Sequence, residues 1–139
     1  MAGHLRPRQR RGVALLELAL VLQLVVLILF GILEYGWMFL RLQEVTQAAR
    51  HGARIGAVAD ATSANVMAAV EAMMAARGMA GLADIEILPA GEVADLDSGT
   101  TLTVRVSVPY ADVGLGVPLL SAFAPTELRA SVSMAKEGP

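Results

Sequence analysis

The sequence predicts an α+β protein in which a long N-terminal transmembrane helix continues into a small head with a second helix and a three-stranded antiparallel sheet. Two patterns predict this fold. Apolar residues run with few interruptions through residues 18–40, and strict alternation of apolar and polar residues appears after residue 84. A length of 139 residues is typical of a single domain.

The composition favours a membrane-associated protein. Hydrophobic residues make up 55% of the chain and charged residues only 17%, below the roughly 25% that is usual in soluble domains. This balance argues against a wholly soluble protein and against a disordered one. The chain has no cysteine, which excludes disulfide frameworks, thiol nucleophiles and cysteine-ligated metal sites.

The apolar run is long enough to cross a membrane. Gln23 is the only polar residue between Glu17 and Glu34, and mostly apolar residues follow Glu34 as far as Leu40. A spanning helix needs about 20 residues. We therefore predict a transmembrane helix over residues 13–40.

The charge distribution sets the expected orientation. Residues 1–12 contain four arginines and no acidic residue, so this basic leader should stay in the cytoplasm by the positive-inside rule. The protein is then a single-pass protein of the inner (cytoplasmic) membrane with an extracytoplasmic head. A cleaved secretory signal is the alternative, but the apolar run is long for one and no small-x-small site follows it, which favours a stable anchor.

Residues 41–59 are expected to extend the helix as an amphipathic segment. Its apolar and small residues form one seam at spacings of three and four: Leu42, Val45, Ala49, Gly52 and Gly56. Small residues at spacings of four allow a second backbone to approach closely. The seam could pack on the protein's own sheet or on another subunit, and packing on its own sheet is favoured.

Residues 60–139 are predicted to form the head. Residues 60–64 offer N-cap side chains for a second helix, and Gly78 is a typical residue to end it. Three strands are expected over residues 84–88, 101–108 and 127–136. The last two strands have one apolar and one polar face, which is typical of an antiparallel sheet that lies on helices.

The link between the second and third strands, residues 110–125, is unusually apolar for a loop exposed to water. Three placements stay open for it. It could fold over the sheet edge, lie on the membrane, or dock on a partner.

The junction between the leader and the apolar run carries a specific pattern. Gly12 follows two arginines, and Glu17 stands five residues later at the start of the apolar helix. By physical chemistry alone, Glu17 could lie at the membrane interface or complement the positive helix N-terminus. The pattern also resembles the class III signal of type IV pilin-like proteins. That resemblance implies that a prepilin peptidase cuts between Gly12 and Val13, and that Glu17 stays in the mature helix and acts in assembly.

Two further stretches resemble the TadE-like family, the minor pseudopilins of the tight adherence (Flp) pilus. They match the patterns F-G-x-x-E-[FY]-G and A-A-R-x-G-A-R through Phe30, Gly31, Glu34, Tyr35, Gly36, Ala49, Arg50, Gly52 and Arg54. The resemblance implies a pilin-like head and a structural role in assembly of a type IV-like pilus or related secretion apparatus. The partners it implies are a prepilin peptidase, other pilins and pseudopilins, inner-membrane platform proteins and the lipid bilayer.

No pattern in the sequence indicates an enzyme. Phosphate-binding glycine loops, G-x-S-x-G and H-E-x-x-H are all absent from the sequence. We therefore expect no catalytic residues, no cofactor and no metal. The basic leader is better explained by the membrane helix behind it than by nucleic acid. The alternative function is that of an uncleaved, membrane-anchored extracytoplasmic binding module.

Overall fold

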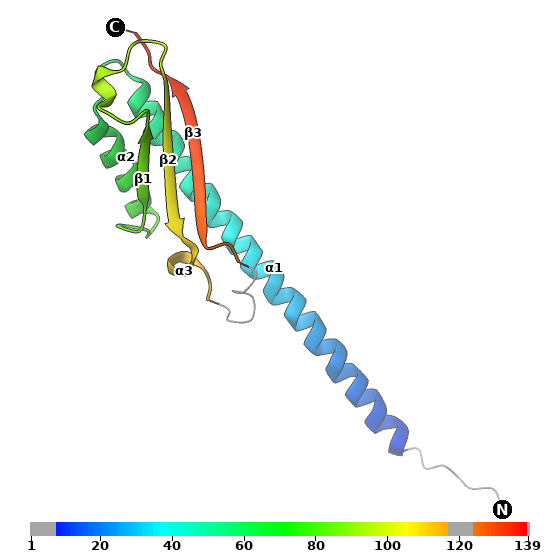
Figure 1. Ribbon diagram of the computed structural model, residues 1–139. Helices are drawn as coiled ribbons and strands as arrows, with labels where there is room; N and C mark the ends of the chain where they lie inside the picture. Colours follow the sequence, from blue (N-terminus) through cyan, green and yellow to red (C-terminus); the bar gives the residue numbers. More distant parts are fainter. Residues whose placement is uncertain (1–7, 117–123, 139) are drawn as a thin grey trace, which may run out of the picture.

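The computed structural model describes residues 8–116 and 124–138, and within them it confirms the α+β fold (Figure 1). The elements in chain order are α1 (Arg8–Ala57), α2 (Ser63–Ala76), β1 (Asp84–Leu88), the short 3-10 helix η1 (Val93–Asp95), β2 (Thr101–Pro109), α3 (Tyr110–Val113) and β3 (Glu127–Ala135). The second helix and the three antiparallel strands lie where the sequence predicts them. The strand β1 has the expected bounds, β2 ends one residue later and β3 ends one residue earlier than expected.

The first helix, α1, has 50 residues and is about 75 Å long at 1.5 Å per residue. It ends at Ala57, two residues before the expected end of the amphipathic segment. Its N-terminal half projects away from the head (Figure 1), and the apolar side chains of residues 13–33 are exposed. Among the described residues, α1 alone is long and apolar enough to cross a membrane. This exposed apolar helix is consistent with a membrane anchor.

The head is a three-stranded antiparallel sheet in the order β1-β2-β3, with α2 and the C-terminal half of α1 on one face. The alternation in β2 places its apolar side chains toward the helices, where four are fully buried: Leu102, Val104, Val106 and Val108. They pack in one core with Val66 and Val70 of α2. The polar side chains of the strands face outward, where the Thr103 and Ser133 hydroxyls hydrogen-bond at 2.8 Å.

The small residues of α1 allow this helix to lie close to the head. A methyl group on Gly52 would come within 2.5 Å of Val70 Cγ2, and one on Gly56 within 2.3 Å of Leu102 Cδ2. Val45 and Ala49 of the same seam are fully buried. The seam therefore packs on the protein's own α2 and sheet, as favoured from the sequence.

The chain beyond β3 returns to the head. Lys136, expected at the end of the last strand, lies one residue past it and is only 5% exposed. Its Nζ donates a hydrogen bond of 2.7 Å to the Val93 carbonyl in η1, and the next backbone N–H, that of Glu137, donates to the Ala57 carbonyl. These bonds tie the end of β3 to the end of α1 and to the loop between β1 and β2.

Candidate functional site

The residues of the expected processing site lie near the exposed end of α1. Gly12 faces open space, and Val13 and Glu17 are exposed. Because α1 begins at Arg8, the peptide bond between Gly12 and Val13 is helical here. No head residue among those described contacts this segment with a hydrogen bond or ion pair, so the segment is accessible to an enzyme or to another helix.

The first TadE-like stretch, residues 30–36, has an exposed side and a side that faces the head. Phe30 and Tyr35 are exposed, and Gly31 and Gly36 have open space where a side chain would stand. Glu34 instead points into the head and is only 5% exposed. The sequence identifies Glu34 as a motif residue but does not reveal that the head buries it.

Two hydrogen bonds connect Glu34 and the nearby Trp37 of α1 to α3, and we call them the neck contacts. The Tyr110 hydroxyl donates to Glu34 Oε1 at 2.7 Å, and Trp37 Nε1 donates to the Val113 carbonyl at 2.7 Å. The other carboxylate oxygen, Glu34 Oε2, is buried without a hydrogen-bond partner among the described residues. The neck contacts fix the end of the head that lies nearest the exposed apolar part of α1.

An ion-pair network continues from the neck toward α2. The Arg41 guanidinium stacks over the Trp37 ring at 4.6 Å from the ring centroid, a cation–π arrangement. Arg41 also donates to Glu44 at 2.8 Å and to the Arg77 carbonyl at 3.1 Å, just after α2. Sequence reasoning missed Trp37, Arg41 and Tyr110 as a group, because Tyr110 lies 76 residues from Glu34 and no local pattern connects them.

The neck contacts bear on the length of the membrane segment. They begin at Glu34, so the last residues of the expected transmembrane helix, 34–40, also carry the head. The part of α1 free of the head, residues 13–33, is about 30 Å long, which matches the hydrocarbon thickness of a bilayer. The boundaries expected from the sequence, after residues 12, 40 and 59, stay predictions.

The pKa of Tyr110 provides a test of the neck contacts. Burial, together with the hydrogen bond and negative charge of Glu34, raises this pKa from 10.0 to about 12. The protonated tyrosine therefore contributes stability that is complete below pH 10 and is lost as the pH rises toward 12. We expect a tyrosinate absorbance transition near pH 12 in the intact protein, with a lower midpoint in Glu34→Gln, which keeps the acceptor and removes the charge.

The variant Tyr110→Phe assigns this transition to Tyr110, since it should remove the transition near pH 12. A wild-type protein that shows no transition near pH 12 would contradict the neck geometry.

The second TadE-like stretch, residues 49–54, also divides between core and surface. Ala49 is fully buried, and Gly52 is buried beneath Val70, so both serve the packing of α1 on the head. Arg50 and Arg54 are exposed on the other side of the helix, and neither makes an ion pair with a described residue. The structure therefore separates the small residues of this motif, which are structural, from two arginines that are available to a partner.

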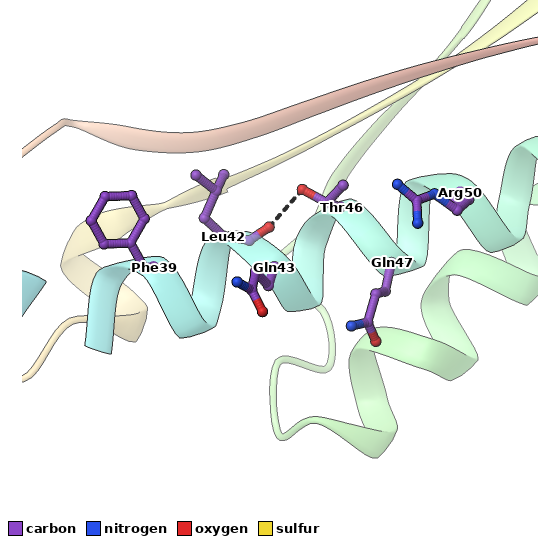
Figure 2. Close-up of a pocket in the computed structure, with 6 residues that line it drawn as sticks. All are labelled: Phe39, Leu42, Gln43, Thr46, Gln47 and Arg50. Carbon is purple, nitrogen blue, oxygen red and sulfur yellow. Dashed lines mark hydrogen bonds between the residues drawn. The ribbon is translucent and has the colours of Figure 1, made fainter. Parts of the chain in front are cut away.

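A hollow lies on the exposed side of α1 just above the neck (Figure 2). It has a volume of about 340 Å³, and all the residues around it belong to α1: Phe39, Leu42, Gln43, Thr46, Gln47 and Arg50. The Thr46 hydroxyl donates to the Leu42 carbonyl at 2.8 Å, within the helix. Within residues 8–116 and 124–138, no group of three or more His, Asp or Glu side chains is placed to hold a metal ion.

The geometry describes a protein with one exposed apolar helix and a small α+β head. The family model for TadE-like proteins matches residues 12–54, from the expected processing site to the second motif. The resemblance to the TadE-like family is thereby confirmed over this segment. No curated protein and no solved structure matches the chain.

Proposed function

We propose that the protein is a TadE-like minor pseudopilin, a structural component in the assembly of an Flp-type pilus or a related secretion apparatus. The observation that carries the proposal is the family match over residues 12–54. The exposed apolar part of α1 supports it, because a pilin-type subunit needs an apolar helix that first anchors it in a membrane and then packs with other helices. The role is structural, without turnover of a substrate.

The proposed path begins in the inner membrane, with residues 1–12 in the cytoplasm and the head outside it. A prepilin peptidase removes the leader after Gly12. The processed helix then associates with other pilins and pseudopilins, guided by inner-membrane platform proteins. The exposed positions of Gly12, Val13 and Glu17 support this path, because all three are free of the head.

The test is the N-terminus of the mature protein in cells that contain a prepilin peptidase. We expect the wild-type protein to begin at Val13. Gly12→Trp should keep the precursor mass, because a side chain at this position crowds the scissile carbonyl in a narrow active site. Gly3→Trp, a substitution of the same kind elsewhere in the leader, should be processed normally. Wild-type protein that keeps its leader beside an active peptidase would favour the alternative, an uncleaved membrane-anchored binding module.

A further inference from the structure

The side of α1 that faces away from the head carries a stripe of residues that are exposed except for the half-buried Thr46, and we call it the outer stripe. Its positions alternate in spacing between four and three residues from Leu18 to Arg50. In the lower part of the stripe, from Leu18 to Ile32, every stripe position is apolar. The upper part consists of Ile32, Gly36, Phe39, Gln43, Thr46 and Arg50. This spacing is the heptad pattern by which one α-helix packs against another.

The outer stripe is separate from the surface that holds the head. At 100° per residue, Glu34, Val45 and Gly52 lie on the other side of α1, where they are buried against α3, α2 and the sheet. Phe39 lies above the part of α1 that is free of the head, and its side chain is 57% exposed. Burial of a large aromatic side chain is strongly favourable, so this exposed ring would be stabilised by a partner. The outer stripe is thus a helix face that residues 8–116 and 124–138 leave largely uncovered.

The residues around the hollow on the outer stripe have the spacing of positions that accept a side chain from another helix. In knobs-into-holes packing, each hole is formed by four residues of one helix at positions i, i+3, i+4 and i+7. The six residues around the hollow, seen along α1 in Figure 2, are spaced as two such holes that share Gln43 and Thr46. This spacing therefore points to an α-helix as the occupant, packed nearly parallel to α1.

We propose that the occupant is the same face of α1 in a second copy of this chain, in a parallel, in-register pair. Two copies inserted in one membrane hold their outer stripes at the same height. Because each head lies on the opposite side of its own α1, the two heads point away from each other and do not collide.

The polar residues of the outer stripe suit such a symmetric pair. The Gln43 amide has both donors and an acceptor, so two copies at one height can hydrogen-bond to each other, and a single polar seam residue is known to fix register. The Thr46 hydroxyl is already bonded to its own helix and requires no polar partner. Arg50 is exposed at the upper end, where its long side chain can extend to water.

The absence of native cysteine allows a direct test by disulfide cross-linking of single-cysteine variants. The full chain is expressed in cells that lack any pilus apparatus, and its membranes are oxidised. Disulfides form only when Cα atoms are within about 7 Å. We expect severalfold more cross-linked dimer from the outer-stripe variants Gln43→Cys and Val25→Cys than from the control variants His51→Cys and Leu27→Cys. The controls lie on other sides of α1, with Leu27 within one helical turn of Val25 and His51 about two turns above Gln43.

A second variant separates a specific pair from chance collision. Phe39→Glu places two carboxylates against each other in the proposed pair, so it should abolish the dimer of Val25→Cys, whereas His51→Glu should leave that dimer unchanged. Equal cross-linking from all four positions, no dimer from any, or a dimer only when other pilus proteins are supplied would each overturn the proposal.

The proposal rests on the membrane anchoring assumed in the proposed function, and not on processing of the leader. Resistance of each variant to alkaline extraction from membranes reports the anchoring separately. A protein that is anchored but does not cross-link along the outer stripe would overturn the pair and leave the proposed function standing.

Discussion

Gly52→Ala is expected to lower the free energy of unfolding of the head by about 1–3 kcal/mol, the usual cost of overpacking a filled core. The added methyl group would stand 2.5 Å from Val70 Cγ2 and 3.5 Å from Val66 Cγ1. Val70 cannot easily turn away, because it is fully buried and β-branched side chains have few rotamers. The two helices must therefore separate, and this exposes part of the core.

The measurement is unfolding of the detergent-solubilised protein by denaturant, followed by the signal of Trp37, which contacts the head through Val113. Gly36→Ala is the matched control, since the same change on the same helix meets open space. There the gain in helix propensity, up to about 1 kcal/mol, should leave stability equal or higher. If both variants had the same stability, the close approach of α1 to α2 at Gly52 would be wrong.

The contrast between these two glycines shows what sequence can and cannot predict in this fold. The spacing of small residues correctly identified the side of α1 that packs, because helix periodicity is a local property. Whether that side meets the protein's own head or another subunit depends on contacts between distant segments, and only the structure shows Val70 and Leu102 against it. The strands could be predicted for the same local reason, since their apolar and polar residues alternate strictly.

The neck contacts were beyond prediction from local patterns. Tyr110 stands at the start of the apolar link 110–125, for which the sequence left three placements open. The structure shows that its first residues form α3, in which Tyr110 and Val113 are buried. Residues 117–123 of this link lie outside the described residues. The one sequence signal for these contacts was Glu34, a carboxylate at the end of an apolar run. Such a group needs a hydrogen-bond partner when water is excluded.

Glu34 and Glu17 both stand at an end of the apolar run, but they differ in their contacts with the head. Glu34 receives a hydrogen bond from the head, whereas Glu17 is exposed and makes no ion pair with any described residue. A charged carboxylate at the edge of the hydrocarbon layer is costly unless it is solvated or paired. No described residue pairs with Glu17, and we propose that its partner comes from another molecule.

Glu17→Gln is expected to abolish association with pilin-type partners while membrane insertion and leader removal stay near normal. On the proposed path, cleavage after Gly12 would free the α-amine of Val13, which is positively charged at neutral pH. In a bundle of staggered helices, this amine would be buried in apolar surroundings, and the carboxylate of Glu17 on a neighbouring helix can neutralise it. A mismatched register would leave two buried charges unpaired, so the pair specifies register more than it adds stability.

The measurement is cross-linking of the processed protein to pilin partners in intact cells, with Glu71→Gln as the control. Glu71 is also exposed, but it lies on α2 in the head, so its loss should leave association unchanged. The substitution by glutamine keeps the size of the side chain and removes only its charge, so an effect on association alone points to the ion pair. Normal association of Glu17→Gln, with insertion or expression as the only property altered, would reject the register role. Glu17 would then be an ordinary membrane-boundary residue whose carboxylate faces the lipid headgroups.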